Sequence, residues 1–360
     1  MIFNKPLIAL DIGSSSVKLA ELSGKGASRK LRTLGLEVIP QGAVMNGEIQ
    51  DASALLKVVK KLLTSMNIEP KGRRVGLSLS GGAVILKRMV LMPDDESDLS
   101  EQVFEEAKQQ FHHDMSDMYF RYQELPSKFT QEGEKAFLIV AGRIDIIEQY
   151  VDVIHKAGMK VGVIDTDTFC LANSFEFNYP IAESLVAIAN VGANSTQVVL
   201  TYEGEYLYSR EFYLGGNLIT KKISEDLAID FENAEGLKIS ASGGDQAIAD
   251  KIRASVRDIN DQINSEINQT VEFFVQHENI PNLSEVKYIF LSGGAAMSLD
   301  LAPSLSSLLQ APVQIINPFN RIDTAPSGVD MEYLLSHGAI YGIATGLGLR
   351  KPDDGQGNKP

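Results

Sequence analysis

The pattern of apolar and polar residues repeats once, with the two copies nearly half a chain apart. Each copy is an apolar run, a glycine-bearing polar turn and a second, largely apolar run, at residues 7–22 (LIALDIGSSSVKLAEL) and 185–200 (LVAIANVGANSTQVVL). Short strands around a small polar turn predict a β-hairpin. A further strand, at 34–40 or 206–214, and then a helical pattern follow each copy. We therefore expect two similar α/β lobes with a cleft between them.

Both predicted turns carry groups that bind anions. The first follows Asp11 and contains Gly13, Ser14, Ser15 and Ser16; the second follows Asn190 and contains Gly192, Ala193, Asn194, Ser195 and Thr196. Backbone N–H groups in such turns form a concave anion site, and the hydroxyls add donors. If both turns face one cleft, they would hold a polyphosphate from opposite sides, and Asp11 would hold a hydrated Mg²⁺. For either turn alone, an ordinary hairpin is the alternative.

Two glycine pairs and one charged pair support the cleft. Gly215 and Gly216 end a strand and open a helix, a context in which backbone can approach a phosphate. Gly293 and Gly294, followed by Ala295, come after the strand VKYIFLS and would let a flat ring lie against the main chain. For Gly293 and Gly294, a tight strand-to-helix turn without a ligand is the alternative. Glu235 and Lys238 share a helix face and could bind a ribose or form a surface ion pair.

The segment from about residue 84 to 159 is extra to the repeat. It predicts strand, helix, two strands and a helix, which is a small α+β module with its own core. Its last helix, from Arg143, would bury the stripe Ile144, Ile147, Val151 and Ile154. Such an insert is better suited to binding a partner than to catalysis. In the second lobe, residues 256–278 predict a long packed helix, with coiled-coil docking as the alternative.

Composition narrows the classes of partner. Lys and Arg total 33 against 47 Asp and Glu, so a net charge of −14 argues against nucleic acid. The single cysteine, Cys170, excludes a disulfide framework and fits a reducing compartment. No apolar run is long enough to span a bilayer, and the start does not resemble a secretory signal. Residues 351–360 (KPDDGQGNKP) should be a disordered tail without a membrane-anchoring helix.

Taken in order, the motifs resemble a known superfamily. DIGSSSVKLAEL, NVGANSTQVV, YLGGNLIT, AEGLK and FLSGGA are similar to the phosphate-1, phosphate-2, second-lobe phosphate, ribose and adenosine motifs of the actin/Hsp70/sugar-kinase superfamily. The insert resembles the 1C subdomain of its FtsA/PilM branch, and the closing NPF and HGAIYGIATGLGLR resemble the PilM family most closely. The implied fold is α/β, with two actin/Hsp70-like (ribonuclease H-like) lobes around a nucleotide cleft.

The resemblance also implies domain limits. The first lobe (1A) would comprise 1–83 and 160–184, the 1C subdomain 84–159, and the second lobe 185–350, with a helical 2B part at about 217–280. The chain would return to 1A at the end.

The resemblance implies a role for each singled-out residue. Asp11 to Ser16 and Gly192 to Thr196 would hold the ATP phosphates, Gly215 and Gly216 would add backbone contacts, Glu235 and Lys238 would hold the ribose, and Gly293 to Ala295 would face the adenine. The superfamily usually has an aspartate at position 190. Asn190 can contact a water on Mg²⁺ but cannot act as a base, which implies at most slow ATP hydrolysis.

A catalytic carboxylate, if there is one, would come from the strand end that carries Asp165 and Asp167, with Asp11 as the other candidate. The alternative role for Asp165 and Asp167 is to cap the helix that starts near Thr168.

By this resemblance, the function is that of a cytoplasmic, ATP-binding scaffold of type IV pilus assembly, peripheral to the inner membrane. Its partners would be the cytoplasmic N-terminal segment of the membrane protein PilN, other pilus components, and a further copy of itself. Two alternatives stay open: an FtsA-like filament-forming ATPase and a small-molecule kinase of the same superfamily.

Overall fold

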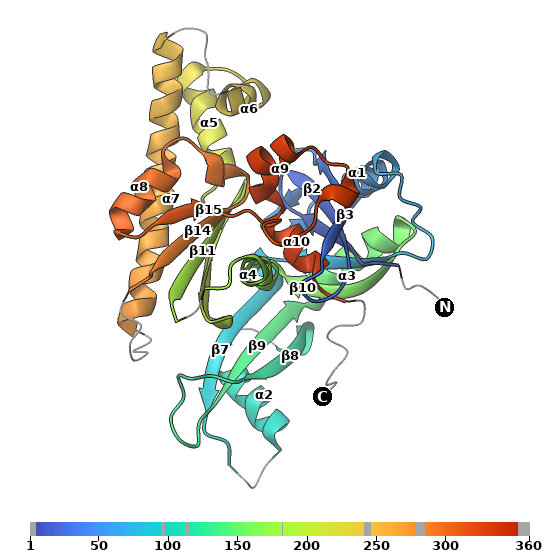
Figure 1. Cartoon of the computed structure of the whole chain (residues 1–360), viewed down its shortest axis with the longest axis vertical. Helices are drawn as coiled ribbons and strands as arrows, with labels where there is room; N and C mark the ends of the chain where they lie inside the picture. Colours follow the sequence, from blue (N-terminus) through green and yellow to red (C-terminus); the bar gives the residue numbers. More distant parts are fainter. Residues whose placement is uncertain are drawn as a thin grey trace.

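The computed structural model describes residues 5–94, 98–111, 115–181, 183–240, 246–277 and 285–351. It confirms two α/β lobes, each built on a five-stranded mixed sheet (Figure 1). The first sheet has the spatial order β10 (Lys160–Thr166), β6 (Arg74–Leu79), β1 (Ile8–Ile12), β2 (Ser16–Ser23) and β3 (Lys30–Val38). The second has the order β15 (Val313–Ile315), β14 (Tyr288–Ser292), β11 (Leu185–Val191), β12 (Thr196–Tyr202) and β13 (Glu205–Phe212).

The two sheets have the same topology. In the first, β1–β2–β3 pair antiparallel and β1–β6–β10 pair parallel. In the second, β11–β12–β13 pair antiparallel and β11–β14–β15 pair parallel. The hydrophobic repeat in the sequence therefore reflects a structural duplication. The third strands were predicted with shifted bounds, at 34–40 and 206–214; both begin earlier and end two residues earlier.

Helices cover both faces of each sheet. The first sheet packs on α1 (Ala52–Ser65) and α3 (Ile144–Lys156), and the second on α5 (Gly216–Leu227), α7 (Gln246–His277) and α8 (Leu301–Leu309). Between the lobes lie α4 (Asp167–Asn178) and α10 (Gly342–Gly348). Alternate residues of β11 explain this layering: Ala187 belongs to the outer core and Ile188 to the central one, because successive side chains of a strand face opposite ways. The end of the chain thus returns to the first lobe, where α10 contacts β1.

The insert is a three-stranded sheet covered by one helix. Its strands have the order β7 (Val84–Leu91), β9 (Lys135–Arg143) and β8 (Met118–Leu125), and α2 (Leu99–Gln110) packs on them. Figure 1 shows it projecting from the two lobes. Its core is separate from the lobes and includes Val103 and Phe137.

The helix α3 departs from the predicted insert. Its buried residues belong to the core of the first lobe, so in packing terms the insert ends near Arg143 and not at residue 159. The predicted stripe is half right: Ile147 and Ile154 are buried, whereas Ile144 and Val151 are only half-buried. Ile146, Tyr150 and Val153 complete the buried face, because α3 is enclosed from two sides by α1 and by the insert's root.

The helical part of the second lobe matches its pattern. The six apolar residues predicted to line the long helix, from Val256 to Phe274, are all buried in α7. The remaining helices are α6 (Phe231–Ser240) and α9 (Met331–His337), and a short hairpin joins β4 (Val44–Met45) to β5 (Glu48–Ile49).

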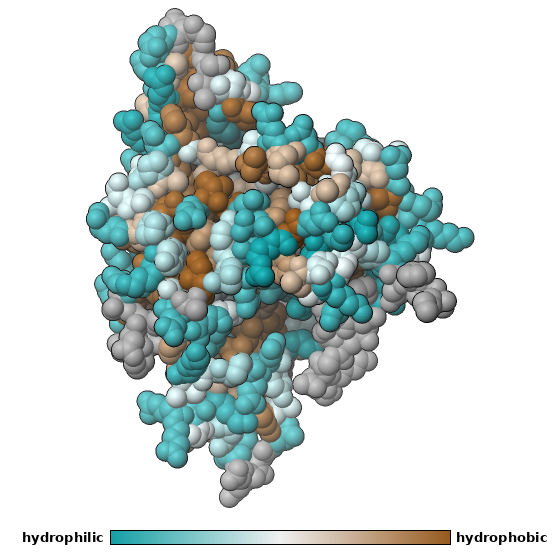
Figure 2. All heavy atoms as spheres, in the orientation of Figure 1, coloured by the Kyte–Doolittle hydropathy of each residue, from teal (hydrophilic) through white to brown (hydrophobic). Residues whose placement is uncertain are grey.

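The surface and the C-terminal residues can be described briefly. On the face in Figure 2, hydrophilic side chains dominate the projecting ends, and hydrophobic ones gather toward the middle. Within the described ranges, no helix is both long and apolar enough to cross a membrane. Cys170 is buried. Of the predicted disordered tail, residues 352–360 lie outside the described part of the chain.

Candidate functional site

A cleft of about 760 Å³ lies between the two lobes, and both predicted turns line it. Of the residues singled out from the sequence, it brings together Asp11, Gly13, Ser14, Ser15, Ser16, Asp167, Asn190, Gly192, Ala193, Asn194, Ser195, Gly216, Glu235, Lys238, Gly293, Gly294 and Ala295. Three others, Asp165, Thr196 and Gly215, do not line it. The two halves of the chain therefore share one cavity at the predicted turns.

The two turns have the same backbone geometry. In the first, Gly13 N–H donates to the carbonyl of Ser16 at 3.1 Å; in the second, Gly192 N–H donates to the carbonyl of Ser195 at 2.9 Å. The same cross-strand register flanks both, with Asp11 opposite Lys18 and Asn190 opposite Gln197. A ligand in the cleft would thus meet two equivalent turns that differ in their side chains.

The charges of the first turn belong to one ion pair. Asp11 is 4% exposed, and its Oδ2 lies 3.1 Å from Nζ of Lys18, which also lines the cleft. Sequence reasoning missed Lys18, although its position two residues after Ser16 returns it to the face that carries Asp11. The pair places an anionic and a cationic group at the same end of the cleft.

A second carboxylate of the first lobe faces the cleft from α4. Asp167 lines it together with Ser80. Burial and the nearby charge of Asp11 raise the pKa of Asp167 to about 7, and the hydroxyls of Ser78 and Ser80 oppose part of this rise. A divalent cation between the two carboxylates would remove their mutual repulsion.

The candidate Asp165 is placed elsewhere. Its Oδ2 lies 3.1 Å from Nε of Arg350, and its Oδ1 accepts the N–H of Thr166. The strand β10 ends at Thr166 and α4 begins at Asp167, so the change from strand to helix gives the two carboxylates different surroundings. The predicted capping role is also wrong: the hydroxyl of Thr166 caps α4 by accepting the N–H of Phe169.

Gly215 and Thr196 act behind the second turn. A Cβ on Gly215 would lie 2.7 Å from the carbonyl oxygens of Gly192 and Ala193, so only glycine fits. The hydroxyl of Thr196 donates to the carbonyl of Leu214. The N–H of Gly216, predicted to meet a phosphate, donates to the carbonyl of Gly192 at 2.9 Å instead. These contacts hold the second turn against the start of α5.

Glu235 and Lys238 form the ion pair that the sequence offered as one alternative, while ribose binding stays a prediction. They form an ion pair of 2.7 Å and also line the cleft. Lys238 Nζ donates to the hydroxyl of Thr220 at 2.8 Å and to the carbonyl of Gly216 at 3.1 Å, which ties α6 to α5. The pair can therefore present a carboxylate to a ligand from a fixed position.

Apolar residues around the third glycine pair extend the cleft. Ile239, Met297 and Leu299 line it and are 75%, 43% and 49% exposed. Gly293 has φ +90°, and a Cβ there would lie 2.4 Å from the carbonyl of Val191. The result is a flat, partly apolar surface suited to an aromatic ring. Sequence reasoning found the glycines but missed the apolar residues, because exposed apolar side chains have no periodic signal.

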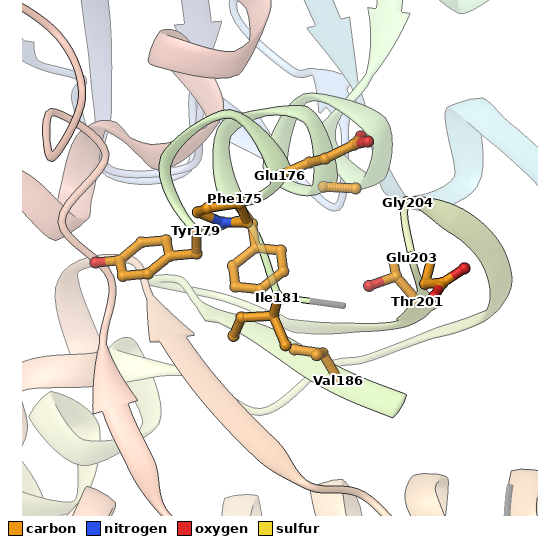
Figure 3. Close-up of a pocket in the computed structure, with 10 residues that line it drawn as sticks. Phe175, Glu176, Tyr179, Ile181, Val186, Thr201, Glu203 and Gly204 are labelled. Carbon is orange, nitrogen blue, oxygen red and sulfur yellow. The ribbon is translucent and has the colours of Figure 1, made fainter. Parts of the chain in front are cut away.

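A second cavity, of about 360 Å³, lies beside the C-terminal half of α4. Figure 3 shows Phe175, Tyr179 and Ile181 on one side and Thr201 and Glu203 on the other. Glu203 is paired with Lys128 of the insert. None of the residues singled out from the sequence lines this cavity, so the candidate site remains the cleft between the lobes.

Within the described residues, no group of three or more His, Cys, Asp and Glu could hold a metal ion by itself. Mg²⁺ commonly keeps several waters and takes one or two carboxylates together with substrate phosphates. Asp11 and Asp167 supply such a pair of carboxylates, so the residues present fit a phosphate-bound Mg²⁺ better than a dedicated metal site.

Comparison with known proteins identifies the family. The model of a family described as "Type IV pilus assembly protein PilM" matches residues 9–352. The chain belongs to the PilM family. Because the match covers the turns, the insert and the closing helices, it favours the pilus interpretation over the two alternatives from the sequence.

Individual relatives agree on the fold. Cell division protein FtsA of Streptococcus pneumoniae serotype 2 (strain D39 / NCTC 7466) is 23% identical over 253 residues, which are 64% of this chain; the chain spans 54% of that relative. A solved PilM–PilN type IV pilus biogenesis complex has a TM-score of 0.81 and 24% identity and covers 96% of this chain and 98% of the other. MreB5 of Spiroplasma citri bound to AMPPNP has a TM-score of 0.52 and 13% identity, and the match covers 95% of this chain and 94% of MreB5. These structures share the actin-like fold with this PilM-family chain.

Proposed function

We propose that this chain is an ATP-binding scaffold of type IV pilus assembly, and that nucleotide sets the angle between its lobes. The observation that carries the proposal is the single cleft shared by two equivalent glycine turns from opposite lobes. Support also comes from an actin-like relative, MreB5, whose structure was solved with AMPPNP and with ADP.

The cleft offers a group for each part of Mg-ATP. Ser14 to Ser16 and Asn194 and Ser195 would meet the phosphates, with Lys18 as their cation, and Asp11 would hold Mg²⁺, with Asn190 acting through water. Glu235 and Lys238 would hold the ribose, and the surface from Gly293 to Leu299 would take the adenine. When bound, Mg²⁺ would neutralise phosphate charge in an acidic protein. Hydrolysis would be slow at most, because Asn190 cannot serve as a base.

The partner would be the cytoplasmic N-terminal segment of PilN. A PilM–PilN complex is among the structures that this chain resembles, at 24% identity over 96% of its length. The insert and the cleft that it shares with the first lobe are the surface we propose for that segment, because the insert has its own core and takes no part in the nucleotide cleft. The protein would then be cytoplasmic and would reach the inner membrane through its partners.

Calorimetric titration with ATP, with and without Mg²⁺, tests the nucleotide site. Asp11→Ala should lose the Mg²⁺-dependent part of the affinity, whereas Asp152→Ala should bind like the wild type, because Asp152 is an exposed residue of α3 paired with Lys156. Equal binding by wild type and Asp11→Ala would overturn the site assignment.

A pull-down with the PilN N-terminal peptide tests the partner. We expect ATP-loaded protein to retain the peptide. If protein that is shown to bind ATP does not retain the peptide, the partner assignment is wrong and the nucleotide-site assignment is unaffected.

A further inference from the structure

The root of the insert lies at the edge of the cleft. The chain leaves β6 at Ser80, which lines the cleft, makes a short 3₁₀ turn at Gly81–Ala83 and enters β7. It returns through the end of β9, where Gly142 pairs with Val84. This turn is therefore joined to both strands of the root, to β7 through the chain and to β9 through strand pairing.

One carboxylate joins this root to the second phosphate turn. Glu211, near the end of β13, accepts the hydroxyl of Ser195 through Oε1 at 2.7 Å. Its Oε2 accepts the backbone N–H of Gly81 at 2.8 Å. Ser195 and Glu211 belong to the second lobe and Gly81 to the root of the insert, so Glu211 links the second phosphate turn to that root.

The root has little freedom of its own. Gly81 has φ +61°, and a Cβ there would lie 2.4 Å from the carbonyl of Asn46, so its turn fits closely against the hairpin of β4 and β5. On the other strand, Arg143 donates to Glu48 of the same hairpin at 2.9 Å. A turn packed this closely would move as a unit rather than absorb a displacement.

Further contacts run along β13 beside the insert. Arg88 of β7 pairs with Glu205 at 3.4 Å, and their side chains are 9% and 12% exposed. Beyond the start of β13, Lys128 pairs with Glu203, and Phe129 packs edge-on against Tyr202 with ring centroids 5.3 Å apart. The strand β13 and its hairpin thus contact the root of the insert, β7 and the loop after β8, with Glu211 as the contact beside the cleft.

We propose that Glu211 couples nucleotide occupancy at Ser195 to the orientation of the insert, an inference that rests on the proposed ATP site. The hydroxyl of Ser195 has one proton to donate, so a phosphate oxygen that accepts it would take it from Glu211. The phosphate would also repel the Glu211 carboxylate. The hydrogen bond from the N–H of Gly81 to Glu211 would then change, and the insert would rotate about its root relative to β13. Glu211 is in this sense a positioning residue.

Distance measurements on the full chain test the coupling. The single cysteine is buried, so spin labels can be attached selectively at Lys108→Cys in the insert and Gln262→Cys in α7. In the wild-type background, saturating Mg-ATP should shift the label distance by more than about 2 Å. In Glu211→Gln, which retains the size of the side chain but not two equivalent acceptors, the shift should fall by at least half. ATP affinity, measured by calorimetry, should stay within about threefold.

Two further variants complete the design. Ser195→Ala leaves the bond between Glu211 and Gly81 in place but removes the proton that a phosphate would take, so its label shift should also shrink. Glu225→Gln, an exposed acid of α5 paired with Lys221, is the matched control and should behave like the wild type.

The outcomes separate the coupling from the proposed function. An unchanged label distance in wild-type protein that binds ATP would overturn the coupling alone, and so would a full shift in both Glu211→Gln and Ser195→Ala. Failure of the wild type to bind ATP would overturn both proposals.

Discussion

The two phosphate turns share a backbone but differ in their means of stabilisation. The first carries a charged cross-strand pair, Asp11 and Lys18, whereas the equivalent pair in the second turn is neutral, Asn190 and Gln197. The first turn also faces a second carboxylate, Asp167. At the two phosphate turns, charge is therefore concentrated on the first lobe.

The second turn is held by its neighbours instead. The start of α5 donates two backbone hydrogen bonds to it, from Gly216 to Gly192 and from Asn217 to Ala193, and Glu211 accepts the hydroxyl of Ser195. The first turn thus carries the charged side chains, whereas the second is connected by hydrogen bonds to α5 and β13.

The largest expected effect comes from removing the cation of the first turn. Lys18→Met leaves Asp11 buried without its partner, and breaking a buried pair in this way costs about 3 kcal/mol. We expect a clear loss of the thermal midpoint and an ATP affinity at least tenfold weaker. Differential scanning fluorimetry and calorimetry measure the two effects.

The matched control is Gln197→Met, at the same register position of the second turn. Gln197 is 7% exposed, and its Oε1 has no hydrogen-bond partner, so its replacement should change stability little. Equal destabilisation by both substitutions would contradict the division of charge between the turns.

A smaller effect should come from the glycine behind the second turn. Gly215→Ala would place Cβ 2.7 Å from two carbonyl oxygens of that turn, whereas a Cβ on Gly13 would lie 3.3 Å from the flexible end of Lys18 and at an ordinary contact distance of 3.6 Å from the carbonyl of Ser16. We expect Gly215→Ala to weaken ATP binding about tenfold, and Gly13→Ala to weaken it less than threefold. If Gly13→Ala weakens ATP binding more than Gly215→Ala in calorimetry, the proposed dependence of the second turn on its close packing against Gly215 is contradicted.

Much of this site could be predicted from the sequence because its signals are local. Glycine, serine and the residue before each turn lie within a few positions of one another, so the sequence predicts both hairpins and the turn residues that line the cleft. Strand alternation could not have separated Asp165 from Asp167, because residues two positions apart share a face of a strand and only the start of α4 at Asp167 breaks that pattern. The ion pair between Asp165 and Arg350 could not be predicted, because the two residues lie far apart in the sequence.

The contacts that distinguish the two turns are long-range and lack a motif. In the sequence, Glu211 is a single acidic residue in a strand of mixed polarity, with no motif around it. Only the fold brings it to Gly81, which lies 130 positions earlier. The assignment of α3 failed for the same reason: an amphipathic pattern shows that a face is buried but not which core buries it. The exposed apolar residues Ile239, Met297 and Leu299 could be placed only once the cleft was known.

The smallest expected effect comes from making the turns electrostatically alike. Asn190→Asp is nearly isosteric and adds a carboxylate on the side of the cleft opposite Asp11. Without Mg²⁺ the new charge should repel the phosphates and weaken ATP binding by roughly 1 kcal/mol, about fivefold. With saturating Mg²⁺ the loss should disappear, because the cation gains a ligand. Gln269→Glu, which adds the same charge on the exposed part of α7, should show no dependence on Mg²⁺. An equal loss for Asn190→Asp at every Mg²⁺ concentration would mean that position 190 does not face the metal, and that the asymmetry of the two turns serves packing and not charge.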